Sequence, residues 1–227
     1  MGPSGLELTM GVVLQARVVF LGAPGAGKGT QAKEVANRGS LAHISTGDML
    51  RAEVAQATEL GRQAKSFMDA GQLVPDAVII GMVQKRIAQP DAAKAWILDG
   101  FPRTLAQAEA LDRELPAGRK LTHVIYFALP EQVLMARLTG RRTCSKCGAI
   151  WHVQTKATKV EGVCDQCGGK TVQRSDDHPD KITQRLIEYR TLTAPLLDYY
   201  RRRNLLRDLD ADRAPATILE ELLQLMR

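Results

Sequence analysis

Short apolar runs alternate along the chain with longer stretches of mixed polarity. The runs are rich in β-branched residues and too short for helices, which is typical of buried strands. They cover residues 18–21, 43–44 with their flanks, 96–98 and 124–127, and a weaker run covers 205–209. Continuous apolar strands separated by helices indicate a parallel sheet that is covered on both faces. The pattern therefore predicts an α/β fold with a doubly wound, five-stranded parallel sheet, followed by a helix over residues 215–227.

Two stretches interrupt this alternation. Residues 45–74 are polar and helix-like, with no credible strand, whereas residues 140–177 hold glycine-rich turns and short β-prone pieces such as Ala149–Val153. Both are predicted to be insertions into the sheet domain. That domain would then consist of residues 16–44, 75–139 and 178–227. Residues 1–15 are interpreted as a leader that lies outside the fold and is expected to be disordered.

Composition and charge narrow the class of protein only slightly. The chain has 227 residues, 44% of them hydrophobic, which is enough for one sizeable core with small lobes. No apolar run approaches the roughly 20 residues that a membrane span needs. The net charge of +6 suits a polyanionic ligand, although an ordinary basic protein explains it equally well. Paired cysteines without a visible signal peptide favour a reducing, cytoplasmic setting.

A glycine-rich loop follows the first predicted strand. Its sequence is GAPGAGKGT, from Gly22 to Thr30, and a helix is predicted over residues 31–37. Glycines let the backbone curl so that its N–H groups face phosphate oxygens, and the helix N-terminus adds a favourable dipole. Lys28 would supply a cation for the β- and γ-phosphates. The strict phosphate-loop pattern has Ser or Thr where this chain has Gly29, so a plain strand-to-helix turn is the alternative.

Two further segments follow strands and carry polar groups. After the second strand, Ser45 or Thr46 can cap a helix, and Arg51 lies one turn further on, where its fork can hold a phosphate. Asp99 ends the third strand, where a carboxylate beside a phosphate loop is placed to hold Mg²⁺, directly or through water. Taken singly, these residues are also compatible with a helix start, a solvated arginine and a turn acid.

The four cysteines form two knuckles. Cys144 and Cys147 are separated by 16 residues from Cys164 and Cys167, and glycine follows each pair. This spacing falls in the zinc-ribbon range, and four sulfur ligands with no open position favour a structural ion. Zn²⁺ is the predicted ion, and iron can also occupy such a site. Two disulfides or inert thiols are the remaining alternative.

These segments together resemble the adenylate kinases, a family of nucleoside monophosphate kinases. GAPGAGKGT is similar to the family's loop, in which Gly-Thr after the lysine is the normal form. ISTGDMLR and LDGFPRT look like the two acceptor-site signatures, and AGQLVPD resembles the far edge of the AMP-binding lobe. The cysteine-rich stretch resembles the long, zinc-type lid of bacterial members. The resemblance covers roughly residues 17–213, nearly the whole chain.

The resemblance implies a reaction and its participants. It implies reversible, Mg²⁺-dependent transfer from ATP to AMP, giving two ADP, by direct in-line transfer with lid closure, and hence a role in nucleotide homeostasis. Residues 45–74 would form the AMP-binding insertion and residues 140–177 the lid. A monomer without nucleic-acid or membrane partners is the family expectation.

The resemblance also implies roles for individual residues. The catalytic groups would be Lys28, Asp99, Arg103, Arg141, Arg174 and Arg185. ATP would be bound by Gly25, Ala26, Gly27, Lys28, Gly29, Thr30, Arg137, Arg141, Ile150 and Trp151. AMP would be bound by Thr46, Arg51, Gln72, Leu73, Val74, Gly100, Phe101, Pro102, Arg103, Gln107, Arg174 and Arg185, with Gln107 reading the adenine edge.

Two other functions are compatible with parts of the sequence. A kinase acting on UMP, CMP or GMP would share the loop and the arginines, and only the base-reading positions Thr46 and Gln107 favour AMP. A zinc-ribbon protein that binds nucleic acid would interleave basic and aromatic residues on the ribbon. Aromatic residues make up only 4% of this chain, which disfavours the second alternative.

Overall fold

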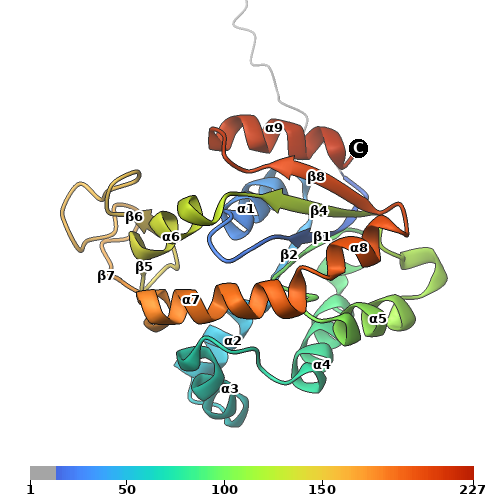
Figure 1. The fold of residues 1–227 in the computed structure, drawn as a ribbon, viewed down its shortest axis with the longest axis horizontal. Helices are drawn as coiled ribbons and strands as arrows, with labels where there is room; N and C mark the ends of the chain where they lie inside the picture. The colour runs from blue at the N-terminus through green and yellow to red at the C-terminus, as the bar shows by residue number, and fades with distance from the viewer. Residues whose placement is uncertain (1–13) are drawn as a thin grey trace, which may run out of the picture.

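A five-stranded parallel sheet forms the centre of the computed structural model, which describes residues 14–227 (Figure 1). In space the strands follow the order β2, β3, β1, β4 and β8. Their bounds are Arg17–Leu21 for β1, Ala42–Ser45 for β2, Trp96–Asp99 for β3, His123–Ala128 for β4 and Leu206–Asp210 for β8. Every neighbouring pair is parallel. The predicted doubly wound sheet is therefore confirmed, including its weakest strand.

Helices cover both faces of this sheet (Figure 1). On one face lie α1 (Lys28–Gly39), α6 (Glu131–Thr139), α7 (Pro179–Glu188) and α9 (Pro215–Leu225). On the other lie α4 (Asp76–Ile87), α5 (Leu105–Glu114) and α8 (Leu196–Arg201). A π-helical turn, Tyr189–Thr193, joins α7 to α8. Among residues 14–227, none of the helices has the length and apolar character needed to cross a membrane.

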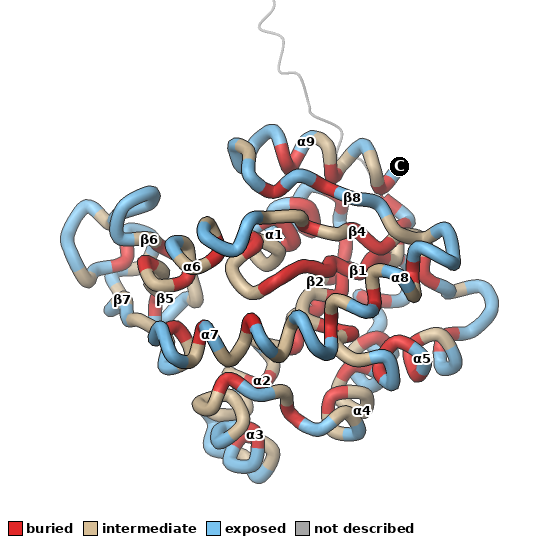
Figure 2. The backbone as a smooth tube through the Cα atoms, viewed as in Figure 1, coloured by how far each residue is buried: buried red, intermediate tan, exposed pale blue. Residues whose placement is uncertain are grey.

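Alternation along the strands explains why there are two apolar cores. In β1, Val18 and Phe20 belong to the core under α1 and α9, whereas Val19 and Leu21 belong to the core under α4, α5 and α8. Successive side chains of a strand point to opposite faces, so a strand that is apolar throughout must be covered twice. Burying each such side chain contributes about 1.5–3 kcal/mol. Figure 2 shows the central strands buried along most of their length.

The topology places three loops at one edge of the sheet. Parallel strands share the same direction, and the register pairs Asp99 with both Phe20 and Ser45. The loops that follow β1, β2 and β3 therefore leave the sheet side by side. This edge is also where the strand order reverses, with β3 on one side of β1 and β4 on the other. Open α/β sheets bind ligands at such a switch point.

The two predicted insertions have different structures. Residues 45–74 contain α2 (Thr46–Ala55) and α3 (Glu59–Ala70), and the Ser45 side chain caps α2 by accepting from the Asp48 N–H at 3.3 Å. Residues 140–177, which we call the lid, contain an antiparallel sheet of β5 (Arg141–Cys144), β6 (Ile150–His152) and β7 (Thr171–Val172). The lid lies at one end of the molecule beside α6, and most of its residues are exposed or half-buried (Figures 1 and 2).

Two predicted boundaries differ from the structure. The first helix begins at Lys28, before the predicted residue 31, because Gly27 takes a left-handed conformation that starts the helix directly after the loop. Leu14, which was assigned to the leader, is buried, and its N–H donates to the Gly39 carbonyl at 3.2 Å. The fold therefore extends beyond the predicted limit at residue 16. The remainder of the predicted leader, residues 1–13, lies outside the described residues.

Candidate active site

The loop between β1 and α1 takes a conformation that only glycines adopt easily. Gly25 has φ +89° and Gly27 has φ +93°, both in the left-handed region. Gly27 occupies the N-cap position of α1, and no side chain caps the helix there. The first N–H groups of a helix need partners, and the helix dipole makes an anion the favoured one. The backbone alone thus prepares this loop for a phosphate group.

Lys28 folds back over the loop. Its Nζ donates to the carbonyls of Gly22 at 2.7 Å and Ala23 at 2.9 Å, so it has hydrogen bonds but no directly bonded carboxylate. Burial lowers the pKa of Lys28 to about 8, with Asp99 opposing this and nearby arginines adding to it. The ammonium is still charged at neutral pH, but three arginines and only one carboxylate, Asp99, act on its pKa, so positive charge is in excess around it. A phosphate group would balance that excess.

Asp99 stands at the end of β3, next to the loop. His43 Nε2 lies 3.6 Å from Asp99 Oδ2, too far for a hydrogen bond but close enough for electrostatic interaction. Burial alone would raise the pKa of Asp99, but His43 and Lys28 outweigh it and hold the pKa below its usual value. Asp99 is therefore a carboxylate at neutral pH, as a residue holding Mg²⁺ directly or through water must be.

Asp99 also explains the unusual glycine after the lysine. A Cβ placed on Gly29 would lie only 2.9 Å from Asp99 Oδ2, closer than real Cβ atoms approach other atoms. The serine or threonine of the strict phosphate-loop pattern would therefore displace this carboxylate. The departure from the pattern is visible in the sequence but its cause is not, since the contact joins the start of α1 to the end of β3.

One buried carboxylate ties the lid to the sheet domain. Asp177 is fully buried and accepts two hydrogen bonds from Arg141 of β5, at 2.7 Å from Nε and 2.5 Å from a terminal nitrogen. Arg185 of α7 donates to the same carboxylate at 3.0 Å. Asp177 therefore orients both arginines. No role was predicted for Asp177 from the sequence, because the fold is what brings Arg141 and Arg185 to it.

A cavity lies between the loop after β3 and the helical insertion, and three arginines line it. We call it the arginine-lined cavity. It is bounded by Thr46, Gly47, Leu50, Arg51, Met68, Gly71, Gln72, Leu73, Val74, Ile79, Gly100, Arg103, Gln107, Asp176 and Arg185. The structure thus brings together most of the residues predicted to bind AMP.

Three of the residues predicted for AMP do not line this cavity. Phe101 is buried in the core under α4 and α5, and Pro102 next to it is buried as well. The Arg174 Nε donates instead to Thr143 Oγ1 of β5, at 2.9 Å. The cavity has apolar walls that the motifs did not indicate, from α2, α3 and α4. They are Leu50, Met68 and Ile79.

The arginines of the cavity form a concentrated positive field. The Arg103 Nε donates to the Gly100 carbonyl at 2.8 Å, which fixes the guanidinium without neutralising it. Burial, together with the charge of Arg185, lowers the pKa of Arg103 to about 10. Both arginines, with Arg141, also act on the pKa of Lys28. Like charges held together in a partly buried place indicate a site for a polyanion.

Three further residues predicted to contact ATP, Arg137, Ile150 and Trp151, do not line the arginine-lined cavity. An Arg137 terminal nitrogen donates to the Ala211 carbonyl at 3.2 Å, and the other lies 4.0 Å from the place that a Cβ on Gly27 would take. Trp151 is buried in the small core of the lid with Cys144 and Cys164. Its predicted contact with the ATP base, and that of half-buried Ile150, stay predictions.

The four cysteine sulfurs converge inside the lid. All four lie within 4.8 Å of one another, and none forms a disulfide. Two of the separations are 3.4 Å, between Cys144 and Cys167, and 3.7 Å, between Cys147 and Cys164. Tetrahedral zinc–thiolate coordination requires separations of about 3.8 Å, from bonds of about 2.3 Å. The donor set and its spacing therefore fit a closed structural site.

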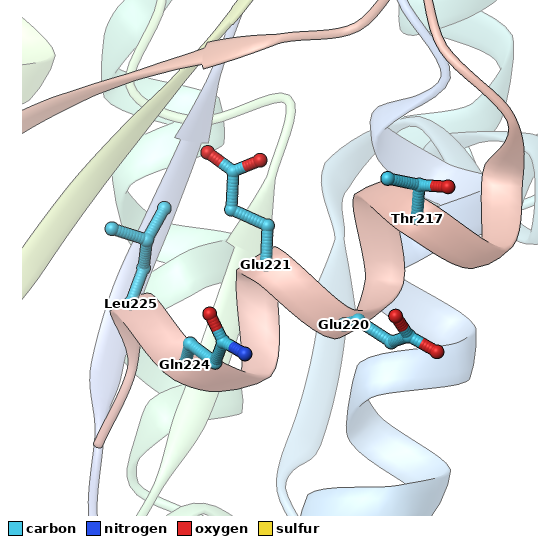
Figure 3. A pocket seen from close by; sticks show the side chains of 5 residues that line it. All are labelled: Thr217, Glu220, Glu221, Gln224 and Leu225. Atoms are coloured by element: carbon cyan, nitrogen blue, oxygen red, sulfur yellow. The ribbon is translucent and has the colours of Figure 1, made fainter.

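A second hollow, more voluminous than the arginine-lined cavity, lies elsewhere on α9 (Figure 3). It is lined by Thr217, Glu220, Glu221, Gln224 and Leu225. Figure 3 shows Glu220 and Glu221 pointing in opposite directions, and Glu221 pairs with Arg213. Side chains that do not converge, without a basic residue among them, do not suit a nucleotide. The smaller arginine-lined cavity is therefore the better candidate despite its size.

The fold and the site define a class of protein. A phosphate loop at the switch point of a doubly wound sheet, with a second cationic cavity beside it, is suited to hold two phosphorylated ligands close together. This is the architecture of a phosphate-loop kinase whose acceptor is itself phosphorylated.

Comparison with known proteins identifies the family within this class. The family model described as adenylate kinase matches residues 20–205. The adenylate kinase of Archaeoglobus fulgidus is 49% identical over 206 residues, which cover 90% of this chain and 95% of the relative. That of Moorella thermoacetica is 52% identical over 205 residues, covering 89% and 94%. That of Carboxydothermus hydrogenoformans is 50% identical over 199 residues, covering 87% and 93%. The chain belongs to the adenylate kinase family.

Proposed function

We propose that the chain transfers the terminal phosphoryl group of Mg²⁺-bound ATP to AMP through the residues described above, giving two ADP reversibly. Members of this family are phosphotransferases that use ATP, AMP and ADP. The observation that carries the residue assignment is the position of the arginine-lined cavity. Arg103 and Arg185 line it, and their charges also act on Lys28 of the phosphate loop. Two phosphate groups bound at these places would lie close together.

The donor and acceptor would occupy different sides of this centre. The N–H groups from Gly25 to Thr30 and the Lys28 ammonium would hold the ATP phosphates, with Arg137 beside the loop. Thr46, Arg51 and Arg103 would hold AMP in the arginine-lined cavity. Gln107 would face its base, and the apolar walls would cover the nucleoside.

The reaction needs little from the protein beyond position and charge. The attacking oxygen of AMP is already ionised at neutral pH, so no general base is required. Lys28 and the arginines at positions 103, 141, 174 and 185 would neutralise the charge that spreads over the transferring group. Mg²⁺, held through Asp99, supplies further charge neutralisation to the ATP phosphates when it is bound. Closure of the lid would exclude water and so prevent hydrolysis of ATP.

A comparison of acceptors tests the proposal. We would incubate the protein with ATP and Mg²⁺ and with each of AMP, GMP, CMP and UMP, and quantify the nucleoside diphosphates. ADP from AMP, with little product from the others, is the expected result. Preference for another base would keep the reaction class and overturn the roles given to Thr46 and Gln107. Folded, metal-loaded protein that phosphorylates none of them would contradict the proposal.

The finer properties of the protein are part of the same proposal. We propose that Cys144, Cys147, Cys164 and Cys167 hold Zn²⁺. All four sulfurs lie within 4.8 Å of one another, and the separations of 3.4 Å and 3.7 Å are close to the sulfur–sulfur distance of about 3.8 Å in tetrahedral zinc sites. We also propose a cytoplasmic monomer without nucleic-acid or membrane partners, since one chain provides every group that the reaction uses. Metal analysis of the purified protein tests the zinc site, and sedimentation tests the monomer.

Gly29→Ala is expected to lower kcat about tenfold or more, because the added Cβ displaces the Asp99 carboxylate and small displacements at a reacting centre are costly. A coupled assay of ADP formation measures this effect. Gly81→Ala in α4 is the matched control, because its Cβ would enter open space. The control should keep full activity and gain up to about 1 kcal/mol of stability. A folded Gly29→Ala variant with normal turnover would refute the explanation given for this glycine.

A further inference from the structure

Gln107 is a buried amide whose two ends have different partners. It lies in the first turn of α5, is only 2% exposed, and borders the arginine-lined cavity. Its Oε1 accepts from the backbone N–H of Arg103 at 2.7 Å, and its Nε2 donates to Asp76 Oδ1 at 2.7 Å. An amide has two N–H groups and two oxygen lone pairs. One of each therefore remains for a ligand.

Asp76 is itself held in place by a neighbouring helix. It is the first residue of α4, and its Oδ2 accepts from Thr104 Oγ1 at 2.8 Å. The same hydroxyl caps α5 by accepting from the Gln107 N–H at 3.2 Å, so its own proton points to Asp76. The carboxylate therefore accepts from both Thr104 and Gln107. This arrangement fixes the start of α4 against the start of α5.

The Arg103 N–H and the Asp76 carboxylate together oppose a rotation of the Gln107 side-chain amide by 180°. Such a rotation would exchange Oε1 and Nε2, and it would bring two donors together at the Arg103 N–H and two acceptors together at Asp76. A backbone N–H can only donate and a carboxylate can only accept, so neither partner can adapt. The rotated amide would leave several buried polar groups unsatisfied, which is costly.

The amide held in this way matches one purine better than the other. The Watson–Crick edge of adenine has an acceptor at N1 and a donor at N6, which suit one free N–H and one free lone pair. The edge of guanine has the reverse order, a donor at N1 and an acceptor at O6, which only the rotated amide could meet. We propose that Asp76 is a positioning residue that sets the preference for AMP over GMP by fixing the orientation of Gln107. The proposal rests on the proposed binding of AMP in the arginine-lined cavity.

Asp76→Asn is the most direct test, because asparagine keeps the size of the side chain but can either accept from Gln107 or donate to it. The ratio of kcat/KM for AMP to kcat/KM for GMP is expected to fall about tenfold or more, while KM for ATP stays unchanged. Asp91→Asn is the matched control, since it makes the same change in an exposed ion pair with Arg86 and should leave the ratio unchanged. If thermal unfolding shows that the asparagine variant is not folded, Asp76→Ser offers the same choice of donor or acceptor.

Making Asp76→Asn in a protein that already carries Gln107→Ala distinguishes a positioning role of Asp76 from a merely structural one. There, Asp76→Asn should have no further effect on the ratio, because a positioning residue acts only through the side chain it orients. An equal fall in both backgrounds would overturn the positioning role. If the ratio of kcat/KM for AMP to kcat/KM for GMP falls with Gln107→Ala but with neither Asp76 variant, the positioning role of Asp76 is also overturned. The proposed function would stay intact in that case. An unchanged ratio with Gln107→Ala would instead overturn the assignment of Gln107 to the AMP base.

Discussion

Replacing Arg103 by alanine is expected to lower kcat about a thousandfold while the protein stays folded. Arg103 lies in the loop between β3 and α5, its Nε donates to the Gly100 carbonyl at 2.8 Å, and it lines the arginine-lined cavity. Removing one preorganised donor from a developing negative charge costs about a hundredfold to a thousandfold, and arginines in phosphoryl transfer often contribute more. A coupled assay at saturating ATP and AMP measures the change in kcat.

Stability separates this loss of activity from unfolding. The Arg103 side chain is half-buried, and burial together with the nearby charge of Arg185 lowers its pKa, so its surroundings disfavour the charge. Alanine relieves that burial and repulsion, so the melting temperature should stay the same or rise. Residues whose placement destabilises the protein are typical of functional sites.

Two further variants complete the test. Arg103→Lys keeps the charge but loses the planar fork, and it should recover only a small part of the activity. Arg62→Ala removes an exposed arginine that pairs with Glu59 on α3, and it should leave kcat unchanged. A nearly normal kcat in folded Arg103→Ala would show that the cavity is not used as proposed.

The strands and the phosphate loop could be predicted from the sequence because their signals are local. A run such as Val18–Leu21 indicates a strand by itself, and the glycines before Lys28 indicate a phosphate loop by their position after that strand. The same locality explains the success with the cysteine knuckles, whose spacing is short enough for their sulfurs to converge. These features need no knowledge of how distant segments pack.

Contacts between distant segments could not be predicted in this way. The approach of Gly29 to Asp99 joins the start of α1 to the end of β3, and the pairing of Asp76 with Gln107 joins α4 to α5. Asp177 carries no signal of its own until the fold brings Arg141 and Arg185 to it. Each of these contacts orients a residue that the motifs did identify. The groups proposed to take part in the reaction were thus indicated by motifs, whereas the groups that hold them in position needed the structure.

Loss of the zinc ion proposed for the lid is expected to unfold the lid while the sheet domain stays folded. The apolar core of the lid consists of little more than Trp151 with Cys144 and Cys164, so burial alone cannot hold this segment together. Binding of structural zinc by cysteine ligands contributes about 10 kcal/mol or more to the folding of small domains. Without the ion, Arg141 would lose its fixed position, and kcat/KM for ATP should fall about a hundredfold.

Cys164→Ser tests this expectation, because Cys164 is a buried member of the cluster and serine is a poor ligand for a soft metal site. Metal analysis should show loss of bound zinc, and protease should cut between residues 154 and 163 while the sheet domain resists.

The fluorescence of Trp151 reports directly on the lid, because Trp96 is the other tryptophan and is fully buried in the sheet domain. In a Trp96→Phe background, the emission of Trp151 should therefore shift to the red when the metal is removed. Ser145→Ala changes an exposed lid residue and should keep the metal, the emission and the activity. A metal-free protein with unshifted emission and normal kinetics would show that the lid folds without an ion.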